Sequence, residues 1–284
     1  MTVEAIDPHG FCAGVTMAVA KARQALEGGG VVHCLHELVH NETVVGELKA
    51  KGMRFVESLD EVPDGGTVLF SAHGVGPAVR RAAERRGLAV IDATCPFVAR
   101  VHRQVREYAA RGLPVVVVGH ARHVEVAGVV DEAEDAGARV AVVASPEDVE
   151  RLPFPAGAAM GAVCQTTLSG DVVRRVMEAL RERHPALVTA ATAEVCTATR
   201  DRQEAVRRFV ASGGDGVLVL GSASSSNTRR LAEIASESGA QTWRAVDAAE
   251  VEKLDFASIR RLGITSGAST PEEVFDDVRK SLKV

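Results

Sequence analysis

The sequence has no apolar run that approaches the roughly 20 residues a membrane-spanning helix needs. Its most apolar stretch is the short run of valines at 115–118. The first ten residues, MTVEAIDPHG, lack the basic and apolar regions of a secretion signal. These absences predict a cytoplasmic protein that does not associate with a membrane.

The chain also lacks a basic stripe. Its 33 lysines and arginines are scattered among 38 aspartates and glutamates, and the net charge is −5. A nucleic-acid-binding surface needs clustered cations, so we expect no nucleic-acid partner. Any anionic ligand must be held locally, by histidine, hydroxyl and backbone groups.

Cysteines are few, and their pattern excludes common roles. There are five of them, and none belongs to a C-x-x-C pair. An odd number argues against a disulfide framework, and the missing close pairs argue against a zinc ribbon or finger. Nucleotide motifs are absent too, because the segment 73–76 lacks the third glycine of a dinucleotide fingerprint and no P-loop occurs.

What the sequence does contain is the pattern of a folded α/β protein. Hydrophobic residues make up 46% and charged residues 25% of the chain. Continuous apolar runs alternate with amphipathic stretches, which favours largely parallel sheets covered on both faces. Pro96 and Gly112 predict the limits of one helix, and the segment 270–273 predicts a capping box that opens the last one. The predicted strands are 31–35, 67–72, 88–93, 114–119, 139–145, 216–222 and 261–267.

The unusual residues fall in loops after these strands, at the edge where open α/β sheets bind ligands. Cys12, Cys95 and Cys196 lie in such loops, about 80 and 100 residues apart, which is close to one small α/β unit each. We therefore expect three small α/β units around a shared centre, each of which donates one ligand. The predicted domains are residues 1–95, 96–193 and 194–284.

The chemistry follows from the residue types in these loops. Three thiolates suit an iron-sulfur cluster better than zinc, because a closed zinc site needs a fourth protein ligand. One iron would then stay open to act as a Lewis acid. Histidine and hydroxyl donors suit a diphosphate, and Asn227 and Ser269 precede predicted helices, whose free amides favour anions. Glu125, two residues after His123, is the carboxylate placed to donate a proton.

Nine motifs together resemble the 4-hydroxy-3-methylbut-2-enyl diphosphate reductases, the LytB or IspH family. They occur in the family's order, from residue 10 to about residue 275. The motifs are GFCAGV (10–15), HELVHN (36–41), SAHGV (71–75), DATCP (92–96), GHxxHxE (119–125), QTTLS (165–169), CTATRDRQ (196–203), SSSNTRRL (224–231) and TSGAST (265–270).

The resemblance implies the last step of the non-mevalonate isoprenoid pathway. The allylic hydroxyl of 4-hydroxy-3-methylbut-2-enyl diphosphate would be removed to give isopentenyl and dimethylallyl diphosphate. A ferredoxin or flavodoxin would supply the electrons.

The resemblance also implies a fold and residue roles. Three small α/β domains would surround a central iron-sulfur cluster in a pseudo-threefold, trefoil arrangement. Cys12, Cys95 and Cys196 would hold one 4Fe-4S cluster with an open iron, whose loss would leave 3Fe-4S. Glu125 and Thr166 would lie beside the substrate hydroxyl, and Glu125 would start proton delivery. The residues implied to hold the diphosphate are His40, His73, His123, Ser225, Ser226, Asn227 and Ser269.

Four positions depart from the family's usual pattern. His9 stands where the family has arginine, Thr16 and Met17 replace Asp-Arg, and Ala127 falls in a segment that usually reads H-P-E-V-E-G-T. These departures leave two alternatives open. One is a paralogue that reductively dehydroxylates a different allylic substrate. The other is a non-catalytic, cluster-bearing redox sensor. The retained Glu125 and Thr166 disfavour it, because a sensor needs no proton donor beside the open iron.

The remaining cysteines and several histidines have ordinary interpretations. Cys34 and Cys164 lie inside apolar runs and are predicted to be small buried hydrophobic residues. The histidines predicted to serve packing or the surface are His33, His36, His102 and His184.

Overall fold

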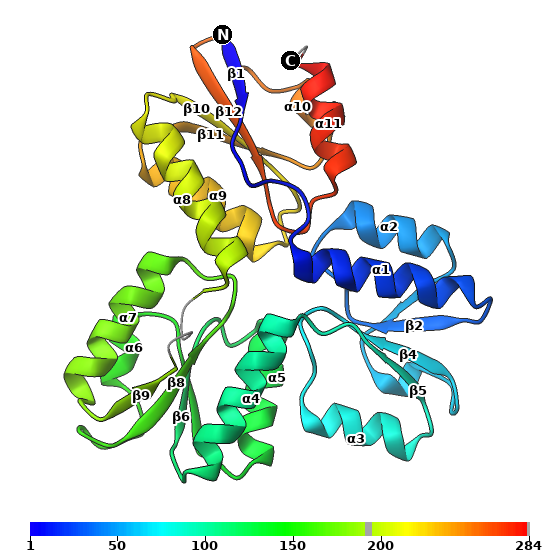
Figure 1. Ribbon diagram of the computed structural model, residues 1–284, viewed down its shortest axis with the longest axis vertical. Coiled ribbons are helices and arrows are strands. Elements are labelled where there is room, and N and C mark those ends of the chain that lie inside the picture. The colour runs from blue at the N-terminus through cyan, green and yellow to red at the C-terminus, as the bar shows by residue number, and fades with distance from the viewer. Residues whose placement is uncertain (191–194, 283–284) are drawn as a thin grey trace. The chain divides into compact units, whose positions relative to one another are not determined.

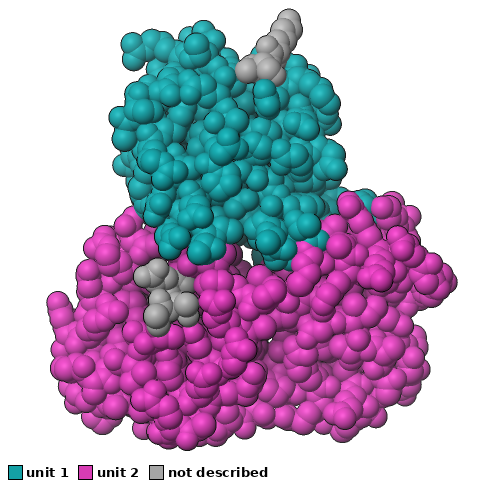
Figure 2. All heavy atoms as spheres, viewed as in Figure 1, with its two compact units in different colours: residues 1–16, 39–47, 197–284 teal, residues 17–38, 48–196 magenta. Residues whose placement is uncertain are grey.

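The computed structural model describes residues 1–190 and 195–282, and every strand pair in them is parallel (Figure 1). The strands form three four-stranded sheets. The prediction of an α/β fold built on parallel sheets is therefore confirmed. The chain divides into two compact units, coloured separately in Figure 2. Unit 1 comprises residues 1–16, 39–47 and 197–284, and unit 2 comprises residues 17–38 and 48–196.

Unit 1 contains the sheet that joins the two ends of the chain. Its strand order is β1-β12-β10-β11. Ala5 pairs with Ile264 and Leu220 pairs with Ser266, so the carboxyl ends of three strands meet at one edge. The strands are β1 (Thr2–Ala5), β12 (Arg261–Ser266), β10 (Gly216–Leu220) and β11 (Gln241–Ala245).

Alternate residues of β10 supply both faces of this sheet. Val217 and Val219 pack against α8 (Thr197–Ala211) and α9 (Ser226–Glu237). Leu218 and Leu220 pack with Phe275 of α11 (Glu272–Ser281) and with α10 (Ala248–Val251). Every residue of β10 is buried, which is why its sequence reads as an unbroken apolar run.

The first sheet of unit 2 has the strand order β3-β2-β4-β5. Val68 and Phe70 of the central strand pack against Ala83 of α3 (Pro77–Arg85). Phe70 pairs with Asp92, so the loops after β4 and β5 start side by side. The strands are β3 (Arg54–Val56), β2 (Val32–Leu35), β4 (Thr67–Phe70) and β5 (Ala89–Asp92).

The second sheet of unit 2 has the strand order β7-β6-β8-β9. Odd-numbered valines of β6 face α4 (Pro96–Ala110) and α5 (Val124–Asp135), and even-numbered ones face α6 (Pro146–Glu150) and α7 (Gly170–Arg183). The strands are β7 (Val140–Val143), β6 (Val115–Val118), β8 (Met160–Cys164) and β9 (Leu187–Thr189).

Two further helices have residues in both units, α1 (Ala13–Glu27) and α2 (Glu42–Ala50), and a short 3-10 helix spans Leu59–Glu61. The predicted start of α4 at Pro96 is confirmed, and Gly112 follows its end with φ +69°. No helix in the described part of the chain is long and apolar enough to cross a membrane.

The predicted capping box at 270–273 is wrong. The residue that caps α11 is Pro271, which offers no side-chain acceptor. The Thr270 hydroxyl instead donates to the Leu220 carbonyl oxygen at 3.0 Å, because this threonine is buried at the carboxyl edge of the sheet. A tertiary hydrogen bond has replaced the local one.

The boundaries of the three predicted domains stay a prediction. The boundary between residues 193 and 194 lies outside the described residues. Strand β1, at the start of the first predicted domain, pairs with β12, near the end of the third.

Candidate active site

In unit 2, Cys95 and His73 lie at the ends of neighbouring strands. Cys95 caps the N-terminus of α4 directly after β5. Its amide donates to the carbonyl oxygen of Ala72 at 3.0 Å, next to His73 in the loop after β4. The Nδ1 atom of His73 lies 3.3 Å from the hydroxyl of buried Ser71. Pairing of β4 with β5 therefore brings a thiol and an imidazole to one edge.

His123 joins this pair from the next helix. It caps α5, and its Nδ1 accepts a hydrogen bond from the Glu125 amide at 3.2 Å. A neutral ring that accepts at Nδ1 carries its proton on Nε2, where it can donate to an anion. The rings of His73 and His123 meet edge to face, with 5.8 Å between centroids.

Glu125 is the most strongly perturbed carboxyl of this group. Its side chain accepts hydrogen bonds from the Thr166 amide at 2.7 Å and from the Thr166 hydroxyl at 3.0 Å. The residue is only 2% exposed. Burial raises the pKa of Glu125 to about 7, although both hydrogen bonds from Thr166 act to lower it.

Thr166 links Glu125 to Cys196, the second predicted ligand cysteine of unit 2. The amide of Cys196 donates to the Thr166 carbonyl oxygen at 3.2 Å. A chain of contacts thus runs from Cys95 through the two histidines and Glu125 to Thr166 and Cys196. The structure brings together all six site residues that the sequence predicts within unit 2.

In unit 1, Cys12 lies beside the loop that follows β12. Its amide donates to the Ala268 carbonyl oxygen at 3.0 Å. The neighbouring Ser269 donates its hydroxyl proton to the His40 carbonyl oxygen, also at 3.0 Å. These contacts place three predicted site residues at the carboxyl edge of the unit 1 sheet.

The N-terminus of α9 brings the remaining predicted residues to the same edge. Ser225 caps the helix by accepting from the Thr228 amide at 3.3 Å, and Ser226 is its first residue. A Cβ added at Gly267 would lie 2.1 Å from the Thr228 hydroxyl, so only glycine lets the loop after β12 approach this turn so closely.

Asn227 is a buried residue of this turn with unused hydrogen-bonding capacity at both of its side-chain polar atoms. It is 4% exposed, and neither its Oδ1 nor its Nδ2 has a hydrogen-bond partner among the residues described. A buried polar group left this way costs free energy, so it points to a polar ligand. The free amides of the first turn of α9 favour an anion at the same place.

Arg202 is a site-supporting residue that the sequence analysis missed. It is 3% exposed, and its Nη2 donates to the Gly10 carbonyl oxygen at 2.8 Å and to that of His9 at 3.3 Å. The Gly10 amide donates to the Ser266 hydroxyl at 2.8 Å. The available signal was a second arginine inside the CTATRDRQ motif, on the helix that starts beside Cys196.

The four departures from the family pattern differ in their surroundings. His9 stacks on Phe275 with 3.6 Å between ring centroids and lies 3.1 Å from the Glu272 carboxylate. Thr16 and Ala127 are exposed, and Met17 is half-buried. His9 is therefore the departure with a defined packing role.

The three predicted ligand cysteines share a position that the other two lack. Each directly precedes a helix, α1, α4 or α8, and each is partly exposed. The first-turn amides of a helix stabilise a negatively charged thiolate. Cys34 and Cys164 are buried inside strands, as predicted, and burial raises the pKa of Cys34 to about 12.

The three predicted ligand cysteines are divided between the units: Cys12 belongs to unit 1, and Cys95 and Cys196 belong to unit 2. Across residues 1–190 and 195–282, no group of three Cys, His, Asp or Glu side chains is close enough to hold a metal ion. The ligand set thus stays a prediction.

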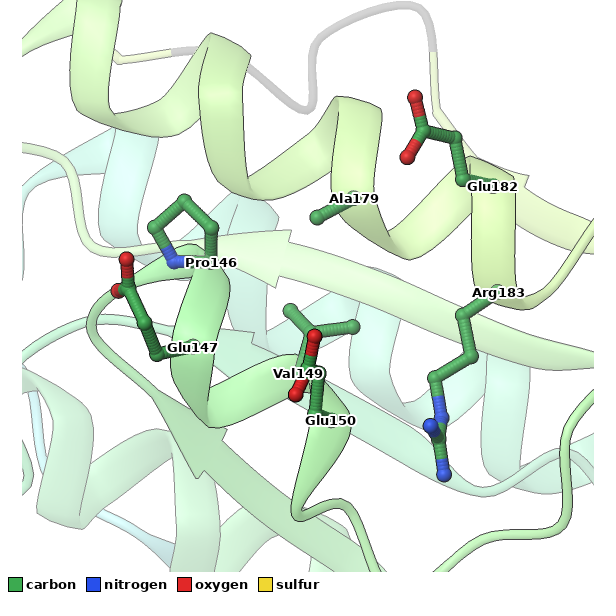
Figure 3. A pocket seen from close by; sticks show the side chains of 7 residues that line it. All are labelled: Pro146, Glu147, Val149, Glu150, Ala179, Glu182 and Arg183. Atoms are coloured by element: carbon green, nitrogen blue, oxygen red, sulfur yellow. The ribbon is translucent and has the colours of Figure 1, made fainter.

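A separate pocket of about 510 Å³ lies between α6 and α7 (Figure 3). Three carboxylates and one arginine contribute its charge, and it includes none of the predicted site residues. The lining residues are Pro146, Glu147, Val149, Glu150, Ala179, Glu182 and Arg183.

Comparison with known proteins agrees with the geometry. The model of the family described as LytB protein matches residues 3–283. A 4-hydroxy-3-methylbut-2-enyl diphosphate reductase of Burkholderia pseudomallei is 45% identical over the whole chain and 90% of its own length. One of Tolumonas auensis is 42% identical over 98% of the chain and 90% of its own length.

A solved structure extends the likeness to three dimensions. The E-1-hydroxy-2-methyl-but-2-enyl-4-diphosphate reductase of Plasmodium falciparum superposes with a TM-score of 0.91 at 32% identity, over 99% of this chain and 86% of that one. With a family model that spans nearly the whole sequence and relatives this similar, the chain belongs to the LytB family.

Proposed function

We propose that this chain reduces 4-hydroxy-3-methylbut-2-enyl diphosphate to isopentenyl and dimethylallyl diphosphate. The relatives that align with the full chain carry the name of this reductase. The observation that carries the proposal is the buried Glu125, held by Thr166 and linked through it to Cys196. The comparisons give no support to a paralogue with another substrate or to a redox sensor.

The cofactor we propose is one 4Fe-4S cluster, with Cys12, Cys95 and Cys196 as its protein ligands. The donor set fits, because these are the cysteines that precede helices and are partly exposed. Three thiolates leave one iron without a protein ligand, and loss of that iron would leave 3Fe-4S. When bound, the cluster supplies electrons and a Lewis acid for the substrate hydroxyl.

The residues that we assign to the diphosphate offer amide, hydroxyl and imidazole donors. In unit 1, Asn227 offers a buried amide with no other partner among the described residues, beside the α9 amides, Ser225 and Ser226. His40 and Ser269 belong to the same edge. In unit 2, His73 and His123 offer imidazole donors. Hydrogen-bond donors of this kind suit an oxygen-rich anion.

Glu125 holds and delivers the proton. With a pKa of about 7, its carboxyl is about half protonated at neutral pH. Protonation of the departing hydroxyl makes water the leaving group. Two electrons and two protons balance the reaction, which forms one C–H bond and one water. Thr166 orients the carboxyl through its amide and hydroxyl.

Two further features belong to the proposal. A one-electron carrier of the ferredoxin or flavodoxin type supplies the electrons, and the reaction takes place in the cytoplasm.

The test is anaerobic reconstitution of the cluster, followed by turnover with 4-hydroxy-3-methylbut-2-enyl diphosphate and a strong one-electron donor. We expect both products in a mass-spectrometric assay. A cluster-loaded chain that binds the diphosphate but forms neither product would contradict the proposal.

A further inference from the structure

His102 and Glu132 form a buried hydrogen-bonded pair between α4 and α5. The Nδ1 of His102 lies 2.8 Å from the Glu132 Oε2, and the residues are 6% and 5% exposed. Arg106 donates to the other carboxylate oxygen at 2.8 Å. Burial alone would raise the pKa of Glu132, but the hydrogen bonds from His102 and Arg106 hold it below its usual value. The Glu132 carboxylate is therefore charged and accepts a hydrogen bond from the Nδ1–H group of His102.

The pair lies at equivalent places on the two helices. His102 follows Cys95 by seven residues along α4, and Glu132 follows Glu125 by seven along α5. Seven residues are two helical turns, about 10 Å, and return a side chain to nearly the same face. The hydrogen bond between His102 and Glu132 thus joins α4 and α5 two turns after Cys95 and Glu125.

The imidazole also packs against the loop that carries His73. A Cβ added at Gly74 would lie 3.4 Å from the Nε2 of His102, and one added at Gly128 would lie 3.5 Å from its Cε1. The Nε2 atom is buried and has no hydrogen-bond partner among the residues described. From α4, the helix that follows Cys95, this one ring therefore contacts both the loop after β4 and the helix that carries Glu125.

The solvent side of the pair is partly open. A pocket of about 310 Å³ is lined by His102, Glu132 and Arg106 together with Thr94, the residue before Cys95. The Arg106 side chain is 54% exposed. Because Arg106 reaches the carboxylate from water, its hydrogen bond contributes less to positioning than that of His102.

We propose that His102 is a positioning residue, which through Glu132 and Gly74 fixes the relative placement of Cys95, His73 and Glu125. It does not touch the substrate. The inference rests on the proposed function for the roles of those three residues, but the packing that carries it does not.

The test compares His102→Phe, which keeps an aromatic ring and loses the hydrogen bond, with His102→Asn, whose amide can replace Nδ1. The matched control is His184→Phe. His184 is also buried, and its Nδ1 lies 3.2 Å from the Ala158 carbonyl oxygen. Ala158 precedes β8, so this contact lies at the opposite end of the sheet. Glu132→Gln tests the same link if the phenylalanine variant does not fold.

Two measurements are made. The first is hydrogen exchange of the cluster-free chain over residues 72–76 and 95–100. We expect protection to fall at least tenfold in His102→Phe and to be largely retained in His102→Asn and His184→Phe. The second is chelator-driven iron release from the reconstituted chain, expected to be 10–100 times faster in His102→Phe. The value of kcat should fall more than KM rises.

Equal changes in the His102 and His184 variants would overturn the inference. If the wild-type chain holds no cluster or forms no product, the proposed function fails, and the exchange measurement still decides the role of His102.

Discussion

Replacing Glu125 with glutamine should remove a pH dependence of folding stability that the buried carboxyl creates. The folded carboxyl has a pKa of about 7, against its usual 4.5. At about 1.4 kcal/mol per pH unit, this difference corresponds to ~3 kcal/mol. Because the folded-state pKa is the higher one, the folded chain binds more protons than the unfolded chain between these values. The stabilisation is complete below about pH 4.5 and is lost as the pH rises through 7.

The assay is urea unfolding of the cluster-free, reduced chain, followed by circular dichroism from pH 5 to pH 8. The wild-type free energy of unfolding should fall by roughly 2.5 kcal/mol relative to Glu125→Gln over this range. Glu134→Gln is the matched control, since Glu134 is exposed on the same helix. The control should follow the wild type to within about 0.5 kcal/mol.

Parallel stability curves for the wild type and Glu125→Gln would refute the reasoning, because the carboxyl would then titrate near its usual value. The same ionisation should control turnover. A proton donor must be protonated, so kcat should fall as the pH rises above 7. In Glu125→Gln it should be lower by a factor of about 10²–10⁴ and lose this pH dependence.

Three further predictions follow from named contacts. Asn227→Leu removes a buried amide that has no partner among the described residues, so the free energy of unfolding of the ligand-free chain in urea should rise by about 1 kcal/mol. Inorganic diphosphate should bind this variant at least tenfold more weakly, as measured by calorimetry. Unchanged binding would exclude Asn227 from the anion site. Cys95→Ser should lower the iron content and visible absorption of the reconstituted chain, and the matched Cys34→Ser should not; equal effects would contradict the ligand assignment. Gly267→Ala should destabilise the chain by about 1–3 kcal/mol, because the new Cβ would overlap the Thr228 hydroxyl, and Thr228→Ala should restore most of the loss.

The central strands could be predicted because strands buried on both faces have continuous apolar sequences. All four residues of β6 are buried, and its sequence is four valines. The short strand β3 and the edge strand β11 were missed. Both mix exposed and buried residues, as in Arg54 and Gln241, so neither shows a continuous apolar run.

The site residues could be predicted because the motifs lie directly after strands, where parallel pairing gathers loops at one edge. His102 and Arg202 escaped this reasoning. His102 was predicted to serve packing or the surface, and Arg202 was not singled out. The roles of these two residues depend on tertiary contacts with distant backbone. His102 packs against Gly74, and Arg202 donates to the Gly10 carbonyl oxygen. No local sequence pattern predicts such contacts.

The sequence by itself determined the α/β class, the central strands, the start of α4 and the identity of the chemical groups, because these depend on composition and short-range periodicity. Only the tertiary structure decided that β1 pairs with β12, that Thr270 bonds Leu220 rather than capping α11, and that Glu125 has a pKa of about 7. Each of these depends on residues distant in the chain, whose approach excludes water and supplies partners that neighbouring residues cannot provide.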